Sequence, residues 1–152
     1  MKFNLCLIAA KKRHPPLGLG YLKTYAQKNL KNLEIDIITP GNLEEILSNK
    51  KLFNKKNLIL GFSCYENPEI LIELCCEIKK KYPNSITLLG GPALTTSYYD
   101  KLDYKNSVDF AITGEGETPL LKLLRKIISG ETDFSDIKGL VYKKNDRYHI
   151  NP

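Results

Sequence analysis

The fold is indicated most clearly by the segment Leu88-Leu89-Gly90-Gly91-Pro92-Ala93-Leu94-Thr95 and by a later one, Val108-Asp109-Phe110-Ala111-Ile112-Thr113-Gly114-Glu115-Gly116-Glu117-Thr118-Pro119. In both segments an apolar run ends in glycine just before an expected helix. An open parallel sheet presents its backbone to a ligand in this way, in the crevice beyond the carboxyl ends of its strands. These two loops are therefore the first candidates for a binding site.

Five apolar runs along the chain have the length and pattern of strands. They cover residues 2–9, 34–38, 58–62, 86–89 and 109–113, and helical patterns separate them. This alternation predicts crossover units and an α/β fold with a five-stranded parallel sheet. After Gly130 the pattern changes, and residues 139–142 and 147–150 flank a polar turn. We expect a hairpin there, packed at a sheet edge or leading out of the domain.

The helices are expected where start signals precede apolar stripes. The first begins after Pro15-Pro16, and its stripe consists of Leu19, Leu22, Tyr25, Ala26 and Leu30. The second begins at Asn67-Pro68, where the asparagine side chain is expected to cap free amides, and it runs to about Lys81 with a stripe of Ile70, Leu71, Leu74, Cys75 and Ile78. The third begins at Thr118-Pro119 and stops at Gly130, and its stripe consists of Leu120, Leu121, Leu124, Ile127 and Ile128. We expect a shorter helix over 43–53 and a weaker one over 94–102.

Composition bounds the class of protein. A chain of 152 residues fits one domain, with an α/β core over 1–130 and a hairpin and exit toward a further domain over 131–152. The net charge of +6 comes from short lysine clusters without interleaved aromatics, which predicts solvated surface and no nucleic-acid partner. The first apolar run is too short to span a bilayer and is not followed by a signal-peptide cleavage site, so we expect it to be a buried first strand. Four cysteines without framework or zinc spacing predict reduced thiols and a cytoplasmic protein.

Several standard sites are missing from the sequence. The segment 15–21 has no GxGxxG spacing, and no P-loop lysine is present, so no standard nucleotide cradle is predicted. Two scattered histidines cannot form a zinc set, and we assign no catalytic residue and no metal ligand. Ser63 follows the third strand and could face the crevice, or it could satisfy local backbone as a turn hydroxyl. Glu115 and Glu117 precede a helix, where capping alone could account for Glu117.

Five motifs in order carry a resemblance to a known family. They are Pro-Pro-Leu-Gly-Leu-Gly-Tyr-Leu (15–22), Gly-Phe-Ser-x-Tyr-x-Asn (61–67), Gly-Gly-Pro-x-x-Thr (90–95), Val-Asp-Phe-x-x-x-Gly-Glu-Gly-Glu (108–117) and Gly-Leu-Val-Tyr (139–142). Together they resemble the N-terminal cobalamin (vitamin B12)-binding domain of cobalamin-dependent radical S-adenosylmethionine enzymes. The resemblance covers nearly the whole chain and implies a flavodoxin-like (Rossmann-like), doubly wound sheet.

The resemblance also implies roles for particular residues. In such domains a Ser-x-Leu motif and a Gly-Gly line the slot for the dimethylbenzimidazole tail of cobalamin, and here Ser63 and Gly90-Gly91 match while Tyr65 stands in the leucine place. The Asp-x-His-x-x-Gly motif that supplies a lower axial histidine in methionine-synthase-like relatives is absent, because Lys12 and Leu17 flank His14 at those positions. The expected cobalamin-binding residues are Pro16, Leu17, Gly18, Leu19, Tyr21, Ser63, Cys64, Tyr65, Asn67, Gly90, Gly91, Pro92, Leu94, Thr95, Gly114, Glu115, Gly116 and Glu117.

The family's second domain carries a CxxxCxxC iron-sulfur motif, and Cys6, Cys64, Cys75 and Cys76 do not have that spacing. S-adenosylmethionine and the cluster are therefore expected only in a radical domain supplied by a longer chain. This chain would bind and orient cobalamin for methyl transfer or a related radical reaction. Two alternatives stay open: a non-catalytic regulatory or interaction module on the same fold, and a small nucleotide- or flavin-binding enzyme. A roomy apolar slot beside Ser63 would favour cobalamin. A slot filled by side chains would favour the interaction module, and a tight anion-binding loop would favour a nucleotide.

Overall fold

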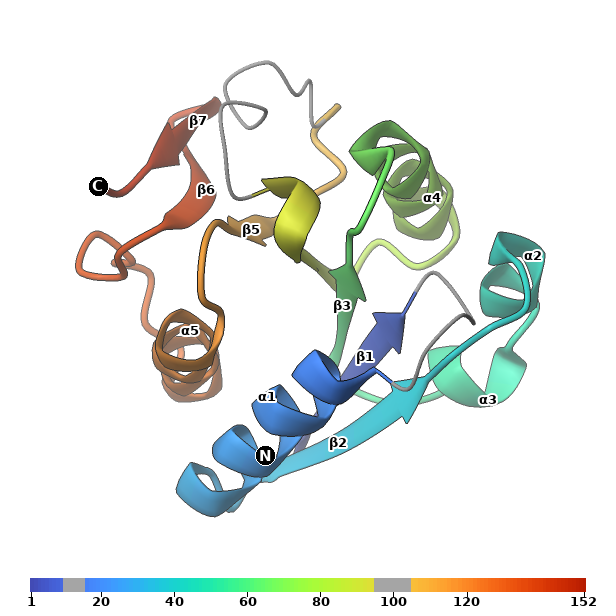
Figure 1. The fold of residues 1–152 in the computed structure, drawn as a ribbon, viewed down its shortest axis with the longest axis horizontal. Coiled ribbons are helices and arrows are strands. Elements are labelled where there is room, and N and C mark those ends of the chain that lie inside the picture. Colours follow the sequence, from blue (N-terminus) through green and yellow to red (C-terminus); the bar gives the residue numbers. More distant parts are fainter. Residues whose placement is uncertain (10–15, 95–104) are drawn as a thin grey trace.

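A computed structural model describes residues 1–9, 16–94 and 105–152 of the chain. Its strands are β1 (Phe3–Ala9), β2 (Leu33–Ile38), β3 (Leu58–Ser63), β4 (Ile86–Gly90), β5 (Phe110–Ile112), β6 (Leu140–Lys144) and β7 (Arg147–Ile150). Its helices are α1 (Leu17–Asn29), α2 (Leu43–Leu47), α3 (Lys50–Phe53), α4 (Pro68–Lys81) and α5 (Glu117–Ser129), with a short 3₁₀ helix, η1 (Pro92–Leu94). The fold is α/β, with a mostly parallel sheet (Figure 1).

The sheet contains seven strands in the order β2-β1-β3-β4-β5-β6-β7, so the prediction of five strands is wrong. Strands β1 to β5 pair in parallel, and the C-terminal hairpin adds β6 and β7 in antiparallel pairing. The hairpin joins the sheet because β5 would otherwise leave a row of unpaired backbone groups at its outer edge. Asn145 and Asp146 close the hairpin with φ of 51° and 59°, which are values that a tight two-residue turn requires.

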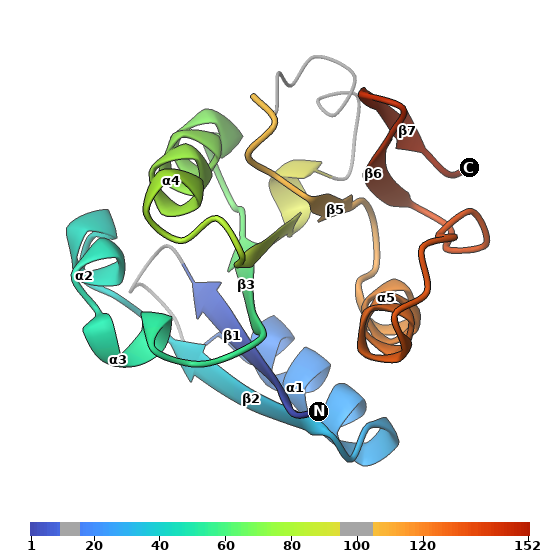
Figure 2. The same cartoon turned by 180° about the vertical axis from the view of Figure 1, so that it is seen from behind.

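Helices pack against both faces of the sheet. Along β1, Leu5 and Leu7 pack on the side of α1 and α5, whereas Cys6 and Ile8 pack on the side of α2, α3 and α4. This alternation follows from the two-residue period of a strand. Figure 1 and the view from behind in Figure 2 show the two groups of helices on opposite sides of the sheet. The core therefore consists of two apolar layers, one on each face.

The doubly wound arrangement is not clear in this structure. Between β4 and β5 the described residues contain only η1, so no described α-helix makes that crossover. The helix expected over 94–102 lies almost wholly outside the described residues. Among the helices that the structure does describe, none is long and apolar enough to cross a membrane.

Three local expectations differ from the structure. Asn67 precedes α4 with φ of 47° and caps no amide with its side chain, so its role is to turn the chain in a left-handed conformation that asparagine tolerates. Tyr25 and Ile70, assigned to buried stripes, are 40% and 50% exposed. The expected helix over 43–53 is two helices, because Asn49 accepts a hydrogen bond from the Leu52 amide and starts α3 anew.

Candidate functional site

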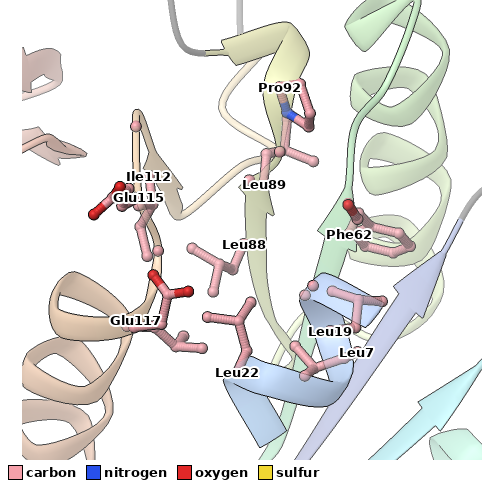
Figure 3. Close-up of a pocket in the computed structure, with 18 of the residues that line it drawn as sticks. Leu7, Leu19, Leu22, Phe62, Leu88, Leu89, Pro92, Ile112, Glu115 and Glu117 are labelled. Carbon is pink, nitrogen blue, oxygen red and sulfur yellow. The ribbon is translucent and has the colours of Figure 1, made fainter. Parts of the chain in front are cut away.

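An apolar slot opens at the carboxyl ends of the parallel strands, between the sheet, α1 and the N-terminus of α5. Its volume is about 270 Å³. The walls come from β1, β3, β4 and β5 on one side and from the two helices on the other (Figure 3). Leu7, Leu22 and Leu88 form part of its apolar wall. A crevice at this position is the usual ligand site of an open α/β sheet.

Ser63 ends β3 and lines this slot. Only 8% of the residue is exposed, and its side-chain hydroxyl has no hydrogen-bond partner among the described residues. The alternative in which Ser63 satisfies a local turn therefore lacks the hydrogen bond that it requires. A buried hydroxyl without a partner costs free energy unless a ligand or water supplies one. This hydroxyl is a polar group available to a ligand inside an otherwise apolar slot.

Gly90 and Gly91 form a shelf beside Ser63. Gly90 lies opposite Ser63 in the β3–β4 pairing, and its carbonyl accepts a hydrogen bond of 2.6 Å from the Cys64 amide. A Cβ on Gly90 would meet no atom within 4 Å, so the space above it is open. Gly91 has φ of 107°, and a Cβ there would lie 2.5 Å from the Cys64 carbonyl oxygen. The first glycine keeps the slot open, and the second lets two loops approach closely.

Two carboxylates stand at the mouth of the slot. Glu115 is exposed, and Glu117 at the start of α5 is half-buried. Neither side chain forms a hydrogen bond or ion pair with a residue that the structure describes. Their negative charge opposes a phosphate at this helix N-terminus, where backbone amides would otherwise favour one. The mouth is therefore suited to hydrogen-bond donors, whether neutral or positively charged.

The structure brings many of the predicted site residues to this slot. Its lining includes Gly18, Leu19, Ser63, Tyr65, Gly90, Gly91, Pro92, Gly114, Glu115, Gly116 and Glu117. Thr95 lies outside the described residues. The lining does not include Pro16, Leu17, Tyr21, Cys64, Asn67 or Leu94.

The residues that do not line the slot have other surroundings. Leu17 and Tyr21 are each 73% exposed on the outer side of α1, and the Pro16 carbonyl accepts the Gly20 amide. Cys64 and Leu94 are buried in the apolar layer on the opposite face of the sheet.

Asn67 lies in a neighbouring polar hollow that shares Tyr65 and Pro92 with the slot. The two hollows meet at these shared side chains, one apolar and the other polar. Asn67 is therefore next to the slot, although it is not part of its lining.

Most of the apolar wall was not predicted from the sequence. The missed residues are Leu7, Leu22, Gly61, Phe62, Leu88, Leu89, Ile112 and Leu120. Leu22 and Leu120 belong to the predicted apolar stripes of their helices. A stripe alone does not show which of its residues pack on the sheet and which line a slot. A Cβ on Gly61 would come 3.0 Å from a Leu7 methyl, so this glycine keeps the slot floor from overcrowding. An isolated glycine inside a strand is the signal that could have identified it.

Asp109, in one of the five motifs, has a structural role. One oxygen of its carboxylate accepts a hydrogen bond of 2.7 Å from the Thr87 amide and forms an ion pair of 2.6 Å with Lys79. The Thr87 hydroxyl also donates to the Ser107 carbonyl at 2.6 Å. These contacts tie the start of β5 to β4 and α4. Asp109 therefore fixes the position of the strand that leads into the loop 114–117.

Three of the four thiols are inert because they are buried. Burial raises the pKa of Cys64 to about 11 and the pKa of Cys6 and Cys75 to about 12. All three are buried, whereas Cys76 is partly exposed. The thiolate is the reactive form, so these three side chains are unsuited to nucleophilic chemistry. Among the described residues, no group of three or more histidine, cysteine or acidic side chains could hold a metal ion.

We expect one fast-reacting thiol in the folded chain at pH 8. Cys76 should react with a disulfide reagent within minutes, and Cys6, Cys64 and Cys75 should react only after denaturation, because burial keeps them protonated. The number of thiols labelled over time, read by mass spectrometry, checks this. Cys76→Ser should remove the fast phase, and a fast phase that persists in that variant would contradict the assignment.

Comparisons with known proteins identify relatives, although no family model matches the chain. The cobalamin-dependent radical SAM methyltransferase TokK of Streptomyces tokunonensis is 25% identical over 142 residues, which cover 90% of this chain and 20% of TokK. The structure of the cobalamin-dependent S-adenosylmethionine radical enzyme OxsB with aqua-cobalamin bound superposes with a TM-score of 0.75 at 17% identity, covering 99% of this chain and 22% of OxsB. This chain resembles the cobalamin-binding domain of such enzymes.

Two other proteins resemble this chain, one over half of its sequence and one in fold alone. The anaerobic magnesium-protoporphyrin IX monomethyl ester cyclase of Synechocystis sp. is 26% identical over 78 residues, or 51% of this chain and 15% of the cyclase. A pilus assembly protein candidate, cpaE, from Burkholderia thailandensis shares the fold with a TM-score of 0.58 at 11% identity, over 84% of this chain and 98% of that chain. The chain spans a fifth or less of the length of TokK and the cyclase.

Proposed function

We propose that this chain binds cobalamin in the slot beside Ser63 and orients it for a radical domain of a longer enzyme. The observation that carries the proposal is the buried hydroxyl of Ser63, which faces an open apolar slot and has no hydrogen-bond partner in the part of the chain that the structure describes. An aromatic base with polar edge atoms fits such a slot, because the walls bury its faces and the hydroxyl meets its edge. The dimethylbenzimidazole tail of cobalamin is a base of this kind.

The residues present fit the group in three respects. Ser63 can donate to or accept from the tail, and Gly90 leaves room above the strand end. Leu7, Leu22 and Leu88 can contact the faces of the base. When bound, cobalamin would supply the reactive chemistry, and the chain would hold the cofactor and exclude water around its tail.

The wider reaction is also part of this proposal. Methyl transfer or a related radical reaction would need S-adenosylmethionine and an iron-sulfur cluster, and the 152-residue sequence has no CxxxCxxC motif to hold the cluster. A second domain would carry them. The same proposal includes a complete doubly wound, flavodoxin-like core over 1–130. It also includes a hairpin over 131–152 that leads toward the second domain, and a cytoplasmic location.

The alternatives are less well supported. A regulatory or interaction module would need no open slot, and here a cavity of about 270 Å³ remains among the side chains. A nucleotide or flavin enzyme would place a phosphate near α5, where Glu115 and Glu117 bring negative charge instead. The open cavity favours cobalamin over the interaction module. The two carboxylates favour it over a ligand whose phosphate must lie at α5, because the phosphodiester of the cobalamin tail can lie outside the mouth.

Titration of the purified chain with hydroxocobalamin and methylcobalamin tests the proposal. We expect saturable binding with a shift of the visible spectrum, and similar dissociation constants for the two forms because they share the tail. Far-UV circular dichroism shows whether the chain is folded. No saturable binding by a folded chain would contradict the proposal.

A further inference from the structure

The described residues that line the slot include few polar side chains. They are Ser63, Tyr65, Glu115 and Glu117. Ser63 ends a central strand, and Tyr65 is 48% exposed. Between these polar groups the walls are apolar, so a polar atom of a bound ligand has few partners to choose from. The residues that do offer partners will decide which ligands are accepted.

Glu117 is placed to act on a ligand at the mouth. Figure 3 shows its carboxylate directed toward the side chains of Leu88 and Leu22, whereas the carboxylate of Glu115 points to the opposite side. Glu117 is half-buried and has no hydrogen bond or ion pair within the described part of the chain. A carboxylate that faces apolar side chains has lost part of its hydration, and a hydrogen-bond donor from a ligand would restore it.

Helix capping does not explain this orientation. A negative charge in the first turn of α5 is favourable for the helix dipole whichever way the side chain points. Glu115 brings the same charge to the same loop and stays exposed. The carboxylate of Glu117 lies over the slot instead, and it is an acceptor only. The group that it meets must therefore be a donor, and a phosphate there would be repelled.

We propose, on the basis of the cobalamin site proposed above, that Glu117 is a specificity-determining residue that accepts a hydrogen bond from a sugar hydroxyl of the cobalamin tail. The aromatic base of the tail carries this sugar. When the base lies in the apolar slot, the sugar is the next group toward the mouth. A free hydroxyl of this sugar is expected at Glu117, whereas the phosphodiester that joins the sugar to the corrin is expected to lie away from the carboxylate.

Binding measurements with two corrinoids test the role of Glu117. Hydroxocobalamin has the tail, and cobinamide lacks its base, sugar and phosphate. Glu117→Ala should weaken hydroxocobalamin binding about tenfold, the loss expected for one hydrogen bond to a charged acceptor. Glu117→Gln should weaken it less, because the amide keeps an acceptor oxygen. Cobinamide binding should not change in either variant. Glu44→Gln is the matched control, because Glu44 is an exposed carboxylate in the first turn of α2 and does not line the slot, and it should bind both corrinoids as the wild type does.

The outcomes separate this inference from the proposed function. If the wild type binds hydroxocobalamin and Glu117→Ala binds it equally well, the role of Glu117 is overturned while the cobalamin site stands. An equal loss for cobinamide would place Glu117 against the corrin rather than the tail sugar, and would also overturn the inference. If the folded wild type binds no corrinoid, both proposals fail. A loss confined to hydroxocobalamin supports both.

Discussion

Replacing Ser63 with tryptophan should weaken hydroxocobalamin binding by at least about a hundredfold, because a bulky ring would occupy the space that the tail needs. Ser63 lines a cavity of about 270 Å³, and an indole would fill a large share of it. The dissociation constant follows from a titration monitored by the visible spectrum. This is the largest effect on binding that we expect from a single substitution in the chain.

Two further variants keep this test interpretable. Ser63→Ala removes the hydroxyl and leaves the space, so affinity should fall only about threefold to tenfold. Gly90→Phe fills the slot from the neighbouring strand, where an added Cβ meets no atom within 4 Å, and it should block binding as Ser63→Trp does. Circular dichroism identifies any variant that fails to fold. Affinity like that of the wild type in a folded Ser63→Trp protein would show that the tail binds elsewhere.

Gly91→Ala should lower the free energy of unfolding by roughly 2–4 kcal/mol, the largest effect on stability that we expect from a small side chain. Gly91 has φ of 107°, and the added Cβ would lie 2.5 Å from the Cys64 carbonyl oxygen and 2.7 Å from the Cys64 nitrogen. Both atoms are backbone and cannot rotate away. Urea denaturation of the wild type and the variant measures the difference.

Gly90→Ala is the matched control for this prediction. It adds the same methyl group one residue earlier, where no atom lies within 4 Å. The free energy of unfolding should change by no more than about 0.5 kcal/mol. Equal losses in the two variants would mean that general glycine effects, and not the close approach of Gly91 to Cys64, determine the result.

The parallel strands could be predicted from the sequence because their apolar runs are continuous. Strands buried on both faces contain few polar residues, and all six residues of β3 are buried. The glycine at the end of β4 and the one shortly after β5 also indicated the edge of the sheet at which the slot opens. At Gly130 the prediction is confirmed, since this residue ends α5 with φ of 76°. These features depend on local sequence and need no knowledge of tertiary contacts.

The remaining features depend on contacts between distant residues. The pairing of β6 with β5 joins Phe110 to Tyr142, and no local pattern distinguishes that hairpin from one that leaves the domain. The wall of the slot combines Leu22 of α1 with Leu120 of α5, and only the packing of both helices on one face brings them together. Whether Asn67 caps a helix or turns the chain depends on the path of the backbone. The loops of the candidate site could be predicted from the sequence, whereas its apolar walls could not.

The affinity of the folded chain for hydroxocobalamin relative to cobinamide shows whether the tail of the cofactor occupies the slot. With the aromatic tail in the apolar slot beside Ser63, the corrinoid with the complete tail should bind at least about tenfold more tightly than the one without it. Both dissociation constants can be measured in the same buffer from the visible spectrum. Equal affinities would overturn the proposed site, because the tail would then contribute nothing to binding.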